Sequence, residues 1–79
     1  MQVEVITMEL NLELLRQMRK ARKLRLIDVA KYLELRTANA YWRIERGITS
    51  LSAVRLMRLC ALFQVGPEVL LSQNQGSVV

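Results

Sequence analysis

The sequence predicts an all-α fold of five short helices, and three observations support this prediction. Apolar residues recur at intervals of three and four over most of the chain, which is the spacing of an amphipathic helix. Residue types suited to helix caps stand where these periodic stretches begin or end. The chain has 79 residues, which is enough for one domain with a small core and too few for two.

The two ends of the chain are predicted to lie outside the helical domain. Residues 1–9 begin with alternating apolar and polar positions, so we expect an N-terminal arm or a short strand there. Residues 10–72 form the predicted helical domain, and the mostly polar residues 73–79 are expected to be a flexible tail.

The first helix is predicted to run from an N-cap at Asn11 to about Arg22, because apolar residues recur there at helical spacing. A second, shorter helix is predicted over residues 26–33, with an apolar inner face. The third is predicted from Thr37 to Arg46. Thr37 can cap its first turn, and Gly47 can end it because glycine accepts the left-handed conformation at low cost.

The fourth helix has the clearest start. Ser52 is a suitable N-cap, and Leu51 and Leu56 have the spacing of a hydrophobic staple around it. Its apolar stripe includes Cys60, which we expect to be a core residue rather than a reactive thiol. A last short helix is predicted over residues 67–71, because proline fits the first helical position.

The basic residues are concentrated in the middle of the chain. All twelve Lys and Arg lie between Arg16 and Arg58 with only three acids, so this segment carries a net charge of +9. The flanking segments carry four acids and no base. A compact basic region is typical of a protein that binds a polyanion, although Lys and Arg also simply solvate helices.

Composition also argues against several function classes. The chain has no histidine and one cysteine, so it lacks the residues for a zinc finger or for cysteine–histidine catalysis. No nucleophile–base pair stands out, and we expect neither an enzyme nor a bound cofactor or metal. No apolar run approaches the roughly 18–20 residues of a membrane span, and no secretory signal is recognisable. A cytoplasmic protein without a membrane partner is therefore expected.

The segments LRQMR, VAKYL and YWRIERG, followed by a capped helix and the ending VGPEVLL, stand in a characteristic order. In this respect residues 12–71 resemble the phage-repressor (Cro-like, XRE) helix-turn-helix family. The resemblance implies a lambda-repressor-like domain that binds double-stranded DNA and regulates transcription, most often as a repressor. One such domain offers few base contacts, so we expect a homodimer. Bound to DNA, it would be associated with the nucleoid.

Three features depart from the family pattern. The stretch from Leu35 to Ile44 is one residue longer than the commonest pattern. Glu34 stands where the family often has glycine in the turn between the second and third helices. Arg25 and Leu26 open the second helix, where the family usually has a small cap and a glutamine that contacts the phosphate backbone. Leu26 cannot make that hydrogen bond, and we expect Arg25 to take over the phosphate contact.

A helical projection of residues 37–46 predicts which side chains of the third helix face outward. At 100° per residue, Tyr41 and Ile44 fall on one side, whereas Asn39, Trp42 and Arg46 centre the other. We expect four residues to contact DNA bases: Ala38, Asn39, Trp42 and Arg43. A further four are expected to contact phosphates: Arg25, Arg36, Thr37 and Arg46. The resemblance also implies a structural ion pair between Arg19 and Glu45.

Several alternatives remain open at this point. The arginines could be solvated surface residues, and Trp42 could pack along the domain flank or in a dimer interface. The dimer surface could be the fifth helix with Val69 and Leu71, or the arm Val3–Ile6 pairing as a strand. The apolar residues Leu26 and Trp42 would also suit a protein-interaction module, or an antitoxin-like autoregulator, on the same scaffold.

Overall fold

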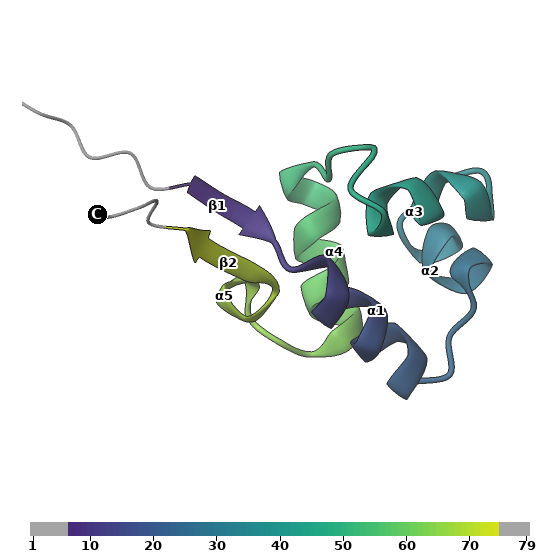
Figure 1. Ribbon diagram of the computed structural model, residues 1–79. Helices are drawn as coiled ribbons and strands as arrows, with labels where there is room; N and C mark the ends of the chain where they lie inside the picture. The colour runs from purple at the N-terminus through teal and green to yellow at the C-terminus, as the bar shows by residue number, and fades with distance from the viewer. Residues whose placement is uncertain (1–6, 75–79) are drawn as a thin grey trace, which may run out of the picture.

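The fold of residues 7–74, which are the residues that the computed structural model describes, consists mainly of helices (Figure 1). Five helices lie in the order α1, α2, α3, α4, α5 between two short strands. The elements are β1 (Thr7–Leu10), α1 (Leu12–Ala21), α2 (Leu26–Tyr32), α3 (Ala38–Glu45), α4 (Ala53–Phe63), α5 (Pro67–Leu70) and β2 (Leu71–Asn74). The five predicted helices are confirmed, and each boundary that the sequence predicted falls within one or two residues of its expected place.

Three of the helices begin at the predicted side-chain caps. The side-chain oxygens of Asn11, Thr37 and Ser52 each accept a hydrogen bond from the backbone N–H three residues later, at 3.1, 3.1 and 3.2 Å. Each cap satisfies one N–H group that has no partner inside its helix. The starts of α1, α3 and α4 are therefore set by single polar residues.

Four helices end in the same way, on a residue in the left-handed conformation. These residues are Lys23, Glu34, Gly47 and Gln64, with φ angles of 57°, 62°, 75° and 59°. The next residue in each case donates its N–H to a carbonyl five positions earlier, at 2.8–3.1 Å. This is the Schellman pattern, which satisfies free carbonyls and reverses the chain sharply. Because Glu34 adopts it without being glycine, the turn between α2 and α3 keeps this geometry despite the departure from the family pattern.

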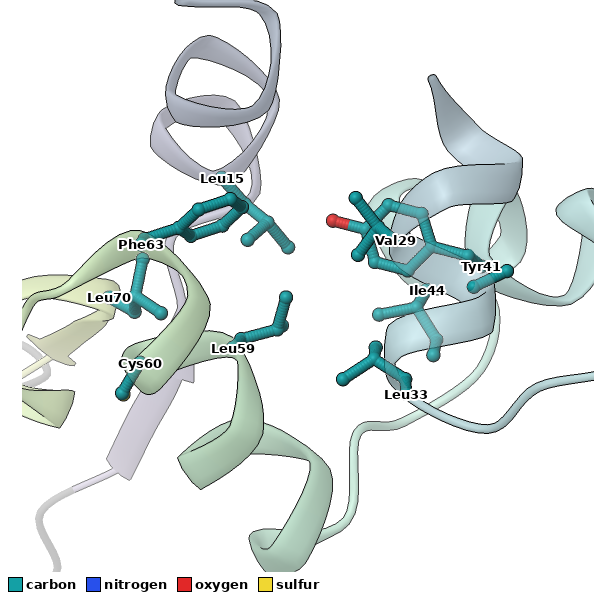
Figure 2. Packing of buried hydrophobic residues seen from close by; sticks show 10 residues of the cluster. Leu15, Val29, Leu33, Tyr41, Ile44, Leu59, Cys60, Phe63 and Leu70 are labelled. Carbon is teal, nitrogen blue, oxygen red and sulfur yellow. The ribbon is translucent and has the colours of Figure 1, made fainter. Parts of the chain in front are cut away.

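The core lies where the helices converge. Figure 2 shows Tyr41 and Ile44 of α3 and Val29 of α2 on one side, facing Leu15 of α1 and Leu59 of α4 on the other. Among residues 10–71, whose burial the structure describes, the buried apolar residues are Leu15, Val29, Ala30, Leu33, Tyr41, Ile44, Leu59, Cys60, Phe63 and Leu70. Cys60 is 4% exposed, so it is a core residue as expected.

The two strands form an antiparallel ribbon at one side of the helices, away from α2 and the start of α3 (Figure 1). Leu10 pairs with Leu71, and the register continues outward to Thr7 opposite Asn74. The strand β2 thus includes residues 73 and 74, for which the sequence suggested a flexible tail. The two paired strands lie more than sixty residues apart in the sequence. The polar segment SQN therefore carries no local pattern that would indicate a strand. Residues 1–6, with the arm Val3–Ile6, and residues 75–79 lie outside the described part of the chain.

Candidate nucleic-acid interface

The helix α3 has one buried face and one exposed face. Tyr41 is 0% exposed and Ile44 3% exposed, so both fix the helix against the core. Asn39 and Arg43 are exposed, and Trp42 is 37% exposed. Because these two large buried residues fix the rotation of the helix about its axis, the residues on the opposite face point away from the core.

The other predicted DNA-contacting residues lie on or beside this exposed face of α3 or at the start of α2. Ala38 is half-buried in the first turn of α3, and Arg46 is exposed at its C-cap. Arg36 and Thr37 are exposed directly before the helix. Arg25 is exposed at the N-cap of α2, which packs against α3. The structure therefore brings seven of the eight predicted contact residues together within residues 36–46, and adds Arg25 from the neighbouring helix.

Trp42 points outward, and a guanidinium group lies over its ring. The Arg46 Cζ atom is 5.3 Å from the centre of the Trp42 ring, which is the geometry of a cation–π contact. One turn of helix separates the two residues, so α3 itself brings them together. The contact restrains both side chains and keeps part of the indole surface covered by a cation.

Arg43 is held by the loop that follows α3. Its Nε donates a hydrogen bond to the Thr49 hydroxyl at 3.4 Å. Its backbone carbonyl accepts the N–H groups of Ile48 and Thr49 at 2.9 and 3.2 Å. Sequence reasoning missed Thr49, because nothing in the segment GITS marks a residue that reaches back over the preceding helix.

Arg25 has a partner of its own. Its Nε and Nη2 donate to the Asp28 carboxylate at 3.1 and 2.9 Å, and its backbone N–H donates to the same carboxylate at 2.7 Å. The hydrogen bond from the Arg25 side chain, followed by that from its backbone, lowers the pKa of Asp28 to about 2. A phosphate would therefore share Arg25 with Asp28. Leu26 is half-buried and packs against the core, so its apolar character is used in packing.

Arg19 and Glu45 form a buried ion pair that ties α1 to α3. The Arg19 Nε and Nη2 atoms donate to the two Glu45 carboxylate oxygens at 2.6 and 3.2 Å, a bidentate arrangement. Their side chains are 11% and 2% exposed. The third nitrogen, Arg19 Nη1, donates to the Leu24 carbonyl at 2.9 Å. Both charged groups are thus fully paired in the interior, and the pair fixes the C-terminal turn of α3.

The Tyr41 hydroxyl lies in the core beside this ion pair. Among the described residues it has no hydrogen-bond partner. Burial, followed by the nearby Glu45 carboxylate, raises the pKa of Tyr41 above its ordinary range. The phenol therefore stays neutral, and the residue acts as a packing element that orients α3.

Seven of the twelve basic residues bind groups of the chain itself. Arg22 donates to the Phe63 carbonyl at 2.8 Å and Arg55 to the Leu33 carbonyl at 3.1 Å. The members of this internally bonded set are Arg16, Arg19, Arg22, Arg25, Arg43, Arg55 and Arg58. The net charge of the basic segment therefore overstates how many cations are available to an external ligand.

Two other features are absent from residues 7–74. No cluster of three or more His, Cys, Asp or Glu side chains in this range could hold a metal ion. No helix in the same range is both long and apolar enough to cross a membrane.

Comparison with known proteins gives one match. A family model described as a helix-turn-helix domain matches residues 13–72, which is most of the chain. No curated protein and no solved structure matches the chain. The matched segment runs from the start of α1 into β2 and so contains α2, its left-handed turn at Glu34 and α3. The chain therefore belongs to the helix-turn-helix domain family, in agreement with its resemblance to the phage repressors, and this family indicates a DNA-binding regulator.

Proposed function

We propose that the protein is a sequence-specific transcription regulator, and more narrowly a repressor, that inserts α3 into the major groove of double-stranded DNA. The observation that carries this proposal is the exposed face of α3. Asn39 and Arg43 project from it, while Tyr41 and Ile44 on the opposite face are buried. An α-helix fits the major groove, and base-edge recognition requires polar side chains whose direction is fixed.

The base contacts follow from the chemistry of these side chains. Asn39 can bridge the N6 and N7 atoms of adenine, and Arg43 can donate two hydrogen bonds to guanine O6 and N7. Ala38 is small, so the first turn of α3 can approach the bases closely. Trp42 offers an apolar edge to a thymine methyl group while Arg46 covers part of its ring.

Phosphate contacts would position α3 in the groove. Arg36 and Thr37 precede the helix and Arg46 follows it, so they flank the base-contacting residues on both sides. Arg25 would contact the backbone from the start of α2 while sharing its guanidinium with Asp28. The free N–H groups in the first turn of α3 add a further favourable site for a phosphate.

One domain offers few base contacts, so we propose that two copies act together as a homodimer. A symmetric dimer would contact half-sites about 34–36 Å apart, one turn of DNA. Val69 of α5 is 42% exposed and supports the C-terminal end as the dimer surface. Binding to the chromosome would place the protein in the cytoplasm, associated with the nucleoid. Helix-turn-helix domains are typically not enzymes, and we propose no catalytic activity.

The test of this function is duplex binding as a function of salt. Three cations per domain are assigned to phosphates, so the logarithm of the binding constant should fall with the logarithm of salt concentration with a slope of about −3 per domain. Fluorescence anisotropy with a labelled random duplex pool measures this slope. No binding at low salt, or binding that does not depend on salt, would refute the proposal.

A protein-interaction role is the second candidate, and one observation favours it. Val54 and Met57 lie one turn apart on α4 and are 66% and 54% exposed. Two large exposed apolar residues this close are suited to a protein contact. This role would also fit an antitoxin-like autoregulator, which binds both DNA and a protein partner. It predicts that Val54→Ser with Met57→Ser abolishes partner binding without changing the salt slope.

A further inference from the structure

The loop after α3 brings Thr49 back over the last turn of the helix. The left-handed conformation of Gly47 reverses the chain, and the N–H groups of Ile48 and Thr49 both donate to the Arg43 carbonyl. Thr49 is therefore attached to Arg43 twice, through this backbone hydrogen bond at 3.2 Å and through its hydroxyl, which accepts from Arg43 Nε at 3.4 Å.

The hydroxyl contact has a consequence for base recognition. An arginine can bind guanine through its two terminal nitrogens or through Nε and one terminal nitrogen, since all five N–H groups lie in one plane. With Nε bonded to Thr49, the end-on arrangement through Nη1 and Nη2 is the one left available. The contact also restricts a long side chain that otherwise loses considerable rotamer entropy when it binds.

We propose that Thr49 is a specificity-determining residue that positions Arg43 for end-on contact with one base pair. This inference rests on the proposed function and adds to it a residue outside α3. Thr49 need not touch DNA in this arrangement, because its effect is transmitted through the Arg43 guanidinium. The base that Arg43 contacts is then a guanine, whose O6 and N7 atoms face the two terminal nitrogens of the arginine.

The experiment measures binding of the full chain to a duplex selected by the wild type. It also measures binding to a set of duplexes that each differ from this duplex at one base pair. Thr49→Val keeps the size and branching of the side chain but removes the hydroxyl. It should lower discrimination at the single base pair that Arg43→Ala also affects, by roughly threefold to tenfold, the range of one modest hydrogen bond. Thr49→Ser retains the hydroxyl and should keep most of the discrimination.

The double variant separates positioning from direct contact. Once Arg43→Ala is present, Thr49→Val should change neither affinity nor preference, because the residue through which Thr49 acts is gone. Uniform weakening on all duplexes, or an equal effect of Thr49→Val in both backgrounds, would show a direct phosphate contact and overturn the inference. Melting curves of the variants confirm folding, and Thr49→Ala is the replacement if valine disturbs the loop.

Failure of this inference can be distinguished from failure of the proposed function. A wild type that prefers certain duplexes, together with a Thr49→Val variant that keeps the same preference, would overturn the role of Thr49 alone. A wild type that binds every duplex equally, or none, would overturn the proposed function and the role of Thr49 with it.

Discussion

Removal of the Glu45 carboxylate tests how the orientation of α3 is maintained. In the Glu45→Ala variant the Arg19 guanidinium keeps its hydrogen bond to the Leu24 carbonyl but loses both carboxylate contacts. Its side chain is 11% exposed, so water cannot readily replace the lost partner. An uncompensated charge of this kind costs about 3–5 kcal/mol. The total free energy of unfolding of a domain this size is only about 4–12 kcal/mol, so the variant should be close to unfolding.

Thermal and urea denaturation followed by circular dichroism measure this loss. At about 4–8 °C per kcal/mol for a domain of this size, the melting temperature should fall by at least 12 °C or so. The matched control is Arg58→Ala, which breaks the ion pair between Arg58 and Glu34. The side chains of this pair are 41% exposed for Arg58 and 72% exposed for Glu34. Exposed pairs contribute about 0–1 kcal/mol, so this variant should melt near the wild type.

A double variant distinguishes burial of charge from loss of packing. Replacing both partners, as in Arg19→Met with Glu45→Leu, removes the unpaired charge and fills the space with apolar atoms. Such replacements are often neutral or stabilising, so the double variant should regain most of the stability lost in Glu45→Ala. If the stability of Glu45→Ala lies within about 1 kcal/mol of the wild type, the ion pair does not hold α3 in place.

Two further predictions concern the ends of the helices. Gly47→Ala should cost about 1–2 kcal/mol, because φ is +75° and the new Cβ would lie 2.9 Å from Leu12 Cδ1. Gly66→Ala is the control: its φ is −79° and the new Cβ would meet only the movable end of the Glu68 side chain, so a smaller loss is expected in urea denaturation. Asp28→Asn should flatten the pH dependence of stability. The folded pKa of about 2 lies below the ordinary value of 3.8, so the wild type gains stability from Asp28 above pH 4 and loses it as the pH falls from 4 to 2. Melting temperatures at both ends of this window should therefore differ less in the variant, and an unchanged difference would contradict the assigned pairing.

Local signals in the sequence were sufficient for the helices. The caps at Asn11, Thr37 and Ser52 are single residues that act on the next three positions, so their effect is visible in the sequence itself. The buried face of α3 follows from helical periodicity, because only one rotation buries both Tyr41 and Ile44.

Some features depend on residues that are distant in the sequence or that carry no recognisable local signal. These features could not be predicted from the sequence. The left-handed helix ends at Lys23, Glu34 and Gln64 lack the glycine that marks such turns in a sequence. At these positions tertiary packing outweighs the cost of the left-handed conformation. The β1–β2 ribbon depends on pairing between opposite ends of the described chain.

The candidate site shows the same division. The residues of α3 could be placed from the sequence because one helix presents them together. Partners contributed by other segments could not be foreseen. The contact of Arg43 with Thr49 arises from the loop geometry, and the bonds of Arg22 and Arg55 to backbone carbonyls arise from helix packing. The Arg19–Glu45 contact was expected only because a motif resemblance placed the two residues opposite each other.

The central claim is that α3 presents Asn39 and Arg43 to base edges, and selection from a random duplex library tests it most directly. The wild type should enrich one sequence with two related half-sites, and Arg43→Ala should lose the preference at one position of each half-site while its melting temperature stays within about 2 °C of the wild type. Enrichment of no sequence by the wild type, or an Arg43→Ala variant that weakens binding to every sequence equally, would contradict the claim.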